Sequence, residues 1–512
     1  MGNGKKDQVR RAALGVASAA LCFSLSSVRP ELGAAGPTCG DIATLRIPGI
    51  TVTTADDVPA GAPLPGLRST SATAICRVAA LATPTTDSRI AIELWVPTAD
   101  AWNGKLLGTA NGGFSGAIPY AAMAAGVGRG YATVGTDTGH TGDQMEFGDG
   151  HPEKIADWAY RSVHVMTDFA KLALRDYRGR FPEHAYFEGC STGGQQALSE
   201  AQRFPRDYDG IVAGDPGHNR VRLILGFLWS WNAVHGEDGS LILPPAKLPV
   251  LTRAAIAACD ANDGLKDGLI GDARACRFDP SALLCPGADD GSCLTAAQVD
   301  AVKKVYEGAR NTRTGEQIFQ GWARGSEQGW GSYIVNPREP VRIDFFRYFA
   351  FHDPHWNART FDWDRDVAFV DDQVPFLSAT SRDLSAFRQN RGKLIMYTGW
   401  ADPVVPPQDT VDYYEGVVKA MGGLQATQQF FRFFPVPAMG HCMGGPGPNS
   451  FDALGALERW SERGVAPEQL LASHSANGIV DQTRPVCAFP KVARYRGTGD
   501  IRAAANFSCV PN

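Results

Sequence analysis

One stretch of the chain limits what it can fold into. Ala185–Glu188 has the character of a strand end, residues 189–193 (Gly-Cys-Ser-Thr-Gly) fit the pattern G-x-S-x-G, and the chain from Gln195 onward favours a helix. A serine between a strand and a helix lies on a tight, strained turn, which flanking glycines allow and which leaves the hydroxyl exposed. The helix start also directs backbone N–H groups toward developing negative charge. The pattern alone is weak, because a glycine-rich turn that packs a helix on a sheet would look the same.

The surrounding sequence alternates between strand-like and helix-like segments. This alternation predicts a mostly parallel sheet with helices on both faces, an α/β class. The expected strands are residues 90–96, 131–135, 185–188, 211–215, 393–397 and 429–434, together with a strand that runs into a glycine turn over 106–114. The clearest expected helices are 157–177 and 453–463.

The alternation stops between about residues 217 and 392. This region is irregular and aromatic, and six of the eleven tryptophans fall in it: Trp229, Trp231, Trp322, Trp330, Trp356 and Trp363. We predict an inserted lid domain at 217–392 between two parts of a catalytic domain, 37–216 and 393–512. Most of these aromatic side chains are expected to form the core of the insertion.

The N-terminus predicts export. Lys5, Lys6, Arg10 and Arg11 precede an apolar run, 12–27, that is too short and too weakly apolar for a stable membrane span. We predict a signal peptide over residues 1–36, and the Arg10-Arg11 pair leaves a twin-arginine signal open. The rest of the chain is ordinary for a globular protein: it is 20% charged with a net charge of −5, and no basic patch predicts nucleic-acid binding.

Cysteine usage agrees with export. Eleven cysteines less Cys22, which lies in the apolar run, leave an even number in the exported chain, and this favours disulfides over metal thiolates.

Residues in the loops that follow the strands provide a candidate catalytic triad; the expectation that catalytic side chains come from such loops is called the strand-end rule. A serine nucleophile needs a base, and the base needs a carboxylate; in this type of sheet they follow the serine in the order Asp or Glu, then His, in loops after strands. Asp402 and His441 follow two late strands in that order, after Ser191. His140, which follows an early strand, is the alternative base, although a supporting role suits it better.

Two cysteines strengthen this assignment. Cys190 directly precedes Ser191 and Cys442 directly follows His441, so a Cys190–Cys442 disulfide would join nucleophile and base. For the oxyanion hole, we expect the amide of Thr192 and an amide of the glycine turn after an early strand, with Gly113 (or Gly112) as the donor.

A second group of residues suggests a hard cation. Asp260, Asp263 and Asp267 alternate with glycines, which suits a calcium ion held by carboxylates, with the carbonyls of Leu265 and Leu269 completing the shell. The spacing is not that of an EF-hand, and a solvated acidic turn is the alternative. Cys259 and Cys276 bracket this loop and could close it, and its distance from the triad in sequence predicts a structural role.

Taken together, the chain resembles the tannase/feruloyl esterase family of exported α/β-hydrolases, which includes mono(2-hydroxyethyl) terephthalate hydrolase. The resemblance covers roughly Cys39 to Cys509. The matching stretches are Asn111-Gly-Gly-Phe114, Thr136-Asp-Thr-Gly-His140, Trp158-Ala-Tyr-Arg-Ser-Val-His164, Gly189-Cys-Ser-Thr-Gly-Gly-Gln195, Asp207-Tyr-Asp-Gly-Ile-Val-Ala-Gly214, the acidic loop after Cys259, Thr398-Gly-Trp-Ala-Asp402-Pro403 and Gly440-His-Cys442.

The resemblance implies an α/β-hydrolase fold with a large inserted lid, the triad Ser191, Asp402 and His441, and an oxyanion hole at Gly113 and Thr192. It also implies structural calcium on the Asp260 loop, no organic cofactor, and five disulfides: Cys39–Cys76, Cys190–Cys442, Cys259–Cys276, Cys285–Cys293 and Cys487–Cys509.

The chain departs from the terephthalate enzyme at two positions. Thr192 stands where that enzyme has a glutamate, and Thr398 stands where a histidine is common. Both differences put activity on terephthalate monoesters in doubt, and the sequence leaves open whether Arg324, Arg342, Arg347, Arg359 or Arg382 meets a substrate carboxylate.

We therefore predict a secreted serine esterase, periplasmic or extracellular, that cleaves small esters of hydroxycinnamic, gallic or related benzoic acids through an acyl-enzyme. An exported peptidase of the same fold and a non-catalytic, calcium-stabilised binding protein are the alternatives. The oligomeric state does not follow from the sequence.

Overall fold

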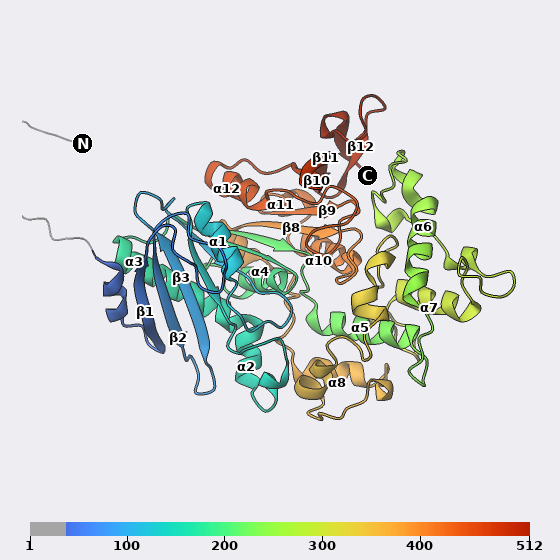
Figure 1. Cartoon of the computed structure of the whole chain (residues 1–512), viewed down its shortest axis with the longest axis horizontal. Coiled ribbons are helices and arrows are strands. Elements are labelled where there is room, and N and C mark those ends of the chain that lie inside the picture. The colour runs from blue at the N-terminus through green and yellow to red at the C-terminus, as the bar shows by residue number, and fades with distance from the viewer. Residues whose placement is uncertain (1–36) are drawn as a thin grey trace, which may run out of the picture. The chain divides into compact units, whose positions relative to one another are not determined.

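A nine-stranded mixed sheet forms the centre of the molecule (Figure 1). The computed structural model describes residues 37–512, which form one compact unit, and the predicted signal peptide lies outside the described residues. The strand order is β1-β2-β3-β5-β4-β6-β7-β8-β9. The pairs β1–β2, β2–β3 and β3–β5 are antiparallel, and every pair from β5–β4 to β8–β9 is parallel. The strands are β1 (Ile50–Val58), β2 (Ile75–Ala82), β3 (Ile90–Pro97), β4 (Lys105–Thr109), β5 (Ala132–Thr136), β6 (His184–Cys190), β7 (Gly210–Gly214), β8 (Lys393–Gly399) and β9 (Phe431–Val436).

Helices cover both faces of this sheet. Along β6, Ala185 and Phe187 belong to the apolar cluster that holds residues of α3 and α4, whereas Tyr186 belongs to the cluster of α12. The period of two along the strand therefore supplies both layers. Every residue of β5, β7 and β9 is buried, which explains why these strands read as continuous apolar runs. The helices are α1 (Tyr120–Gly128), α2 (Pro152–Ala156), α3 (Ser162–Arg178), α4 (Thr192–Arg203), α5 (Arg220–Val234), α6 (Leu248–Cys259), α7 (Ala296–Glu307), α8 (Asp366–Gln373), α9 (Ser385–Gln389), α10 (Pro407–Ala420), α11 (Leu424–Thr427) and α12 (Ala453–Arg463).

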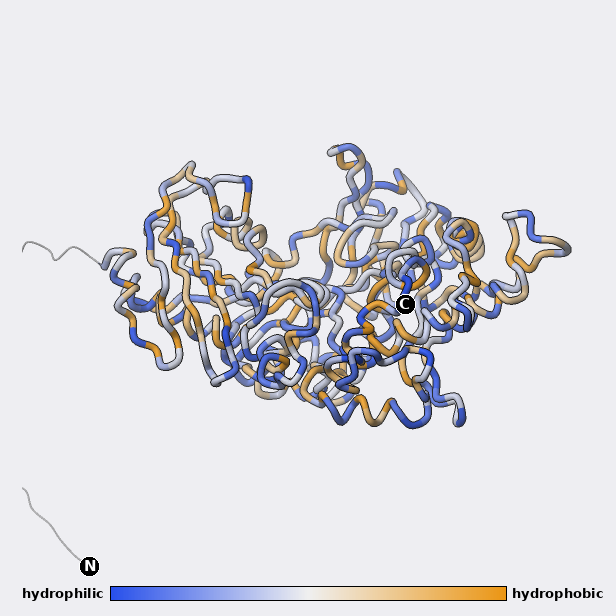
Figure 2. The backbone as a smooth tube through the Cα atoms, turned by 60° about the horizontal axis from the view of Figure 1, so that its bottom comes forward, coloured by the Kyte–Doolittle hydropathy of each residue, from blue (hydrophilic) through white to orange (hydrophobic). Residues whose placement is uncertain are grey.

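The antiparallel edge strands differ from the buried centre. In β1, exposed residues alternate with half-buried ones along much of the strand, and this part of the chain, at the left of Figure 2, carries both hydrophilic and hydrophobic stretches. Such alternation is typical of a sheet that faces water on one side.

The long insertion lies between β7 and β8, which are adjacent parallel strands. It contains α5 to α9, and its aromatic residues do form a core: Trp322 and Trp330 are fully buried. That core is continuous with the apolar residues on one face of the sheet. The fold is an α/β-hydrolase fold.

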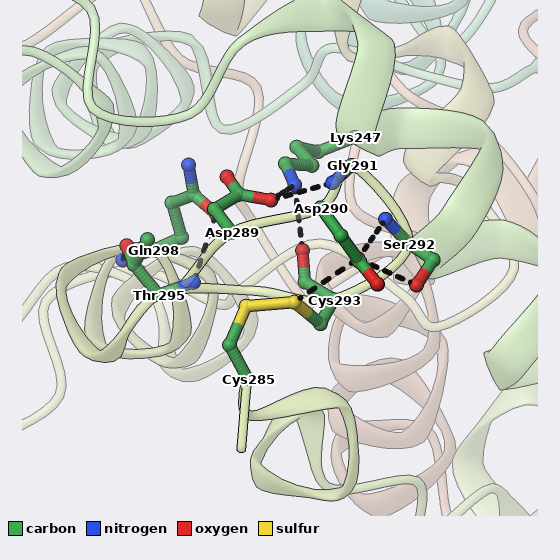
Figure 3. The surroundings of a disulfide bond; sticks show 9 residues. All are labelled: Lys247, Cys285, Asp289, Asp290, Gly291, Ser292, Cys293, Thr295 and Gln298. Atoms are coloured by element: carbon green, nitrogen blue, oxygen red, sulfur yellow. Dashed lines mark hydrogen bonds and ion pairs between the residues drawn. A yellow bond between two sulfur atoms is a disulfide. The ribbon is translucent and has the colours of Figure 1, made fainter. Parts of the chain in front are cut away.

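A disulfide between two cysteines that are only 8 positions apart closes a turn in this insertion (Figure 3). Cys285 and Cys293 are bonded, and the buried ammonium group of Lys247 donates to the carbonyl of Cys293 at 2.7 Å and pairs with the Asp289 carboxylate. A buried lysine needs such partners, because its charge has left water.

The C-terminal region forms two hairpins outside the main sheet. β10 (Gln469–Ala476) pairs with β11 (Ile479–Cys487), and β12 (Lys491–Tyr495) pairs with β13 (Phe507–Pro511).

The helix predicted at 157–177 differs in detail from the observed one, since a π-helical turn over Asp157–Arg161 precedes α3.

Candidate active site

Ser191 lies on the turn between β6 and α4, as its sequence context predicts. Its backbone is in the left-handed region, with φ of 64°. Its amide donates to the carbonyl of Gly214 at 2.9 Å, so neighbouring β7 holds the turn. A Cβ at Gly189 would lie 2.6 Å from the backbone of Gly193, and a Cβ at Gly193 would lie 2.6 Å from the Cβ of Ala110, which explains why both sides of the serine are glycine.

The predicted acid and base are in contact. Asp402 follows β8 and His441 follows β9, and the Nδ1–H of His441 donates to Oδ2 of Asp402 at 2.8 Å. Oδ1 of Asp402 accepts from the amides of Val404 (2.7 Å) and Val405 (3.0 Å). The carboxylate is fully buried and oriented on both oxygens, which leaves Nε2 of His441 available for a proton from a hydroxyl.

A disulfide ties the serine turn to the histidine loop. Cys190 and Cys442 are bonded with their Cα atoms 5.9 Å apart, although 252 positions separate them in sequence. The other four disulfides are Cys39–Cys76, Cys259–Cys276, Cys285–Cys293 and Cys487–Cys509, so all five pairs match those that the resemblance implies.

The two predicted oxyanion residues also lie together. The Thr192 hydroxyl donates to the carbonyl of Gly113 at 2.7 Å, and it accepts from Nη2 of Arg220 at 2.8 Å. Nε of Arg220 donates to Oε1 of Gln195 at 2.7 Å. Arg220 is buried, and burial lowers its pKa, as does the nearby charge of Arg342. This chain of contacts connects the insertion to both turns of the site.

Sequence reasoning passed over Arg220 and Asp215. Arg220 belongs to α5 and resembles any polar residue at a helix start. Asp215 was recognised only as the residue that ends a strand, although the strand-end rule that selected Asp402 applies to it as well. One carboxylate oxygen of Asp215, one carboxylate oxygen of Asp402 and one ring nitrogen of His441 lie within 4.8 Å of one another.

The protonation states of these groups depend on one another. Burial by itself lowers the pKa of His441, but the charge and hydrogen bond of Asp402 and the charge of Asp215 outweigh burial and raise the pKa to about 9. Burial raises the pKa of Asp215 well above its usual range, and the charge of Asp402 adds to this rise.

The alternative base, His140, has other partners. Its Nε2 lies 2.7 Å from the carbonyl of Phe114, its Nδ1 lies 3.3 Å from the Thr138 hydroxyl, and its ring stacks on Phe147. Burial lowers its pKa. This position supports the glycine turn at 111–114 and leaves the pairing with a carboxylate to His441.

Among the arginines considered from the sequence, Arg342 lies nearest the glycine turn. Its Nη2 would be 2.8 Å from a Cβ placed on Gly113, it pairs with Asp143 at 3.0 Å, and its guanidinium group lies over the ring of Phe114. Arg347 instead pairs with Glu339 and Asp344.

The acidic loop is closed by Cys259–Cys276. Asp260 accepts from the amides of Asp267 and Gly268, Asp263 accepts from the amide of Leu265, and Asp267 accepts from the amide of Leu269. The second oxygen of Asp267 pairs with the buried guanidinium of Arg484. The clusters of three candidate metal ligands that residues 37–512 bring within 4.8 Å do not include this loop.

Comparison with known proteins identifies the family. The sequence profile described as tannase and feruloyl esterase matches residues 76–510. The chain belongs to the tannase and feruloyl esterase family. It is 38% identical to an uncharacterized esterase of Xanthomonas campestris pv. campestris, covering 93% of this chain and 92% of that protein. It is 33% identical to the mono(2-hydroxyethyl) terephthalate hydrolase of Piscinibacter sakaiensis, covering 80% of each.

A solved structure supports the same assignment. The fold matches that of feruloyl esterase B from Aspergillus oryzae with a TM-score of 0.88 and 30% identity, covering 92% of this chain and 99% of that one. This member of the family is therefore a carboxylic ester hydrolase that acts on small ester molecules. Within residues 37–512, no helix is both long and apolar enough to cross a bilayer.

Proposed function

We propose that this esterase cleaves its substrate through an acyl-enzyme formed on Ser191. His441 accepts the serine proton at Nε2 and returns it to the leaving alcohol, while Asp402 orients the imidazole and stabilises its charged form. The amides of Thr192 and Gly113 hold the carbonyl oxygen as it becomes negative. Water then attacks the acyl-enzyme and releases the acid. The observation that carries the proposal is the His441–Asp402 contact, joined by a disulfide to the strained turn at Ser191.

We propose esters of aromatic acids as the substrates. The names of the relatives support this class, since they refer to feruloyl and terephthalate esters. Behind the glycine turn, Phe114 stacks on Trp158 with ring centroids 4.2 Å apart, and Phe349 lies edge-on to Phe114; all three rings are buried and support the turn. Phe349 comes from the insertion, which we propose acts as the lid that shapes the acyl pocket.

The test is release of free acid from methyl ferulate, methyl gallate and mono(2-hydroxyethyl) terephthalate. Wild type is compared with Ser191→Ala and with Ser475→Ala, a matched change at an exposed position of β10. We expect wild type and Ser475→Ala to cleave at least one of these esters at equal rates and Ser191→Ala to lose about 10³-fold or more of the activity. Cleavage of none of the three by the folded, oxidised protein would contradict the substrate class, and an active Ser191→Ala would contradict the mechanism.

We also propose that the chain is exported, with residues 1–36 as its signal. The five disulfides support this proposal, because such bonds persist in oxidising compartments. Intact mass of the protein recovered outside the cytoplasm of the producing cell tests it: loss of the first 36 residues or so is expected, and a full-length cytoplasmic product would contradict it.

We further propose that the acidic loop binds calcium as a structural ion. The donor chemistry fits, because the carboxylates of Asp260, Asp263 and Asp267 face only one buried cation, Arg484, among the described ion pairs of this loop. Burial raises the pKa of Asp263, and the charges of Asp267 and Asp260 raise it further. A divalent ion would neutralise the two remaining charges, and the carbonyls of Leu265 and Leu269 are the proposed neutral ligands.

Chelation tests this proposal without an activity assay. With calcium at 100 times its Kd, binding adds about 2.7 kcal/mol to the free energy of unfolding, which corresponds to roughly 3 °C in Tm for a chain of this size. EDTA should lower Tm by this amount, and calcium, but not an equal excess of magnesium, should restore it. An unchanged Tm, together with no bound calcium by elemental analysis, would contradict the proposal and leave Arg484 as the only cation, among the described ion pairs, that offsets the negative charge of the three aspartates.

A further inference from the structure

Asp215 is a second carboxyl group behind the proposed base. It follows β7, and its amide donates to the carbonyl of Tyr397 in β8 at 2.8 Å. The residue is fully buried and its backbone φ of 35° is positive, so the chain holds it in an unusual conformation. Strained residues that persist in a buried position are often part of a functional site.

The two oxygens of Asp215 join the loops that carry the acid and the base. Oδ1 accepts from the amide of Gly399 at 2.7 Å and from the hydroxyl of Thr398 at 3.2 Å, at the end of β8 just before Asp402. Oδ2 accepts from the amide of Cys442 at 3.0 Å, directly after His441. One side chain therefore holds both loops.

The charges in this group do not balance when every carboxyl is ionised. Asp215, Asp402 and the His441 ring lie within 4.8 Å of one another, and both aspartates are fully buried. With a neutral imidazole, two adjacent buried carboxylates would carry two negative charges, which is costly in a medium of low polarity. The group is thus expected to keep one proton, either on Asp215 or on His441, and the two titrate as a unit.

The other charged or titratable groups near this unit are few and distinct. Arg220 from α5 lowers the pKa of His441. Tyr397 of β8 lies beside Asp215. Burial raises the pKa of Tyr397, and the charges of Asp215 and of Glu188 in β6 raise it further, so the Tyr397 hydroxyl stays neutral. The positive charge of Arg220 and the negative charges of the two aspartates thus oppose each other at His441.

We propose that Asp215 is a positioning residue of the catalytic unit: it competes with His441 for one proton and so fixes the lower pH limit of the reaction. This inference rests on the proposed serine mechanism. While the imidazole holds the shared proton, it cannot accept the proton of Ser191. The negative charge of Asp215 favours that inactive form, and the acidic limb of activity therefore lies at a higher pH than Asp402 alone would produce.

The test compares wild type with Asp215→Asn, which keeps the shape and removes the charge. The rate of Ser191 labelling by an alkyl fluorophosphonate is measured against pH: the serine oxygen bonds to phosphorus, fluoride leaves, and His441 takes the proton. Asp409→Asn is the matched control, because Asp409 is also buried but bonds to Asn219. The pH profile of kcat/KM for the best ester provides a second readout.

We expect the acidic midpoint of Asp215→Asn to lie about one pH unit below that of wild type. The ratio of variant rate to wild-type rate should then rise about tenfold from the plateau to a pH well below both midpoints. Asp409→Asn should keep the wild-type midpoint. A labelling rate that falls equally at every pH, with the midpoint unchanged, would overturn the proposal and leave Asp215 as a structural support.

A variant that fails to fold and a failure of the proposed function each have their own readout. If Asp215→Asn does not fold, Asp215→Ser, which also removes the charge, takes its place: a midpoint below that of wild type supports the proposal, and an unchanged midpoint overturns it. If wild type neither labels at Ser191 nor cleaves any ester at any pH, the proposed function fails. If it labels and the midpoint does not move, only this inference fails.

Discussion

Removal of the Cys190–Cys442 disulfide should affect stability and catalysis in separable ways. The variant is Cys190→Ala combined with Cys442→Ala, and the matched control is Cys487→Ala combined with Cys509→Ala. The first disulfide closes 252 positions of chain and the second closes 22. Both variants lose one covalent closure, and the closures differ in length and in distance from the site.

The expected loss of stability follows from the length of each closed loop. The chain-entropy relation gives about 5.5 kcal/mol for the long loop and about 3.4 kcal/mol for the short one. A chain of this length unfolds with an entropy of roughly 1 kcal/mol per kelvin, so Tm should fall by about 5 °C and about 3 °C. Scanning calorimetry of the oxidised proteins measures both shifts.

The catalytic effect should differ much more than the shift in Tm. Cys190 and Cys442 are adjacent to Ser191 and His441, and a displacement of about 1 Å between reacting groups can reduce the rate about 10²-fold. We expect kcat/KM of the Cys190/Cys442 variant to fall by about 10-fold to 10²-fold at 20 °C, where it remains folded. The Cys487/Cys509 variant should stay within about threefold of wild type.

The result that would refute this reasoning is a folded Cys190/Cys442 variant with kcat/KM within about threefold of wild type. The contacts of Asp215 with Gly399 and Cys442 would then be sufficient to hold the histidine loop. The disulfide would contribute to stability alone.

Two other changes test buried polar groups. Arg220→Lys cannot bridge Thr192 and Gln195, because a lysine lacks the planar set of donors, so kcat should fall about tenfold or more with little change in KM; an unchanged kcat would argue against a role at the oxyanion hole. Glu200 is buried beside Asp207, and burial followed by the charge of Asp207 raises its pKa well above the usual range. A raised folded-state pKa contributes stability that is complete below the unfolded-state pKa of about 4.3 and is lost as pH rises. Glu200→Gln should therefore raise Tm relative to wild type at pH 8 but not at pH 4, and a difference in Tm that is constant across this range would contradict the explanation.

The central sheet was predictable because its strands are short apolar runs that end at turn residues. β6, β7, β8 and β9 all lie within a few residues of their predicted positions, since β7 and β9 are fully buried and each of β6 and β8 has a buried apolar stretch of three residues. The C-terminal hairpins were not predicted. β10 and β11 carry many exposed residues, and such strands leave a weak hydrophobic pattern.

The contact between Asp402 and His441 was predictable for a topological reason. Both residues follow parallel strands that are neighbours in the sheet, so the order of the strands brings them to one edge. Asp215 follows the next strand and lies at the same edge, but a sequence does not reveal which strand-end carboxylates turn inward. Its role depends on the amides of Gly399 and Cys442, which come from two other loops.

The insertion was expected to be a lid with its own core, and its contacts connect it to the chemistry as well. Arg220 donates to Thr192 at the proposed oxyanion hole. The indole of Trp322 donates to the carbonyl of Pro403, next to Asp402, at 2.8 Å. Trp322 and the helices on one face of the sheet belong to one apolar cluster. A segment that shares its core with the sheet and bonds to both halves of the site would not move as an independent lid. Changes inside it that alter the substrate pocket are therefore expected to alter kcat as well as KM, because they are transmitted to the residues proposed to hold the oxyanion and to orient the base.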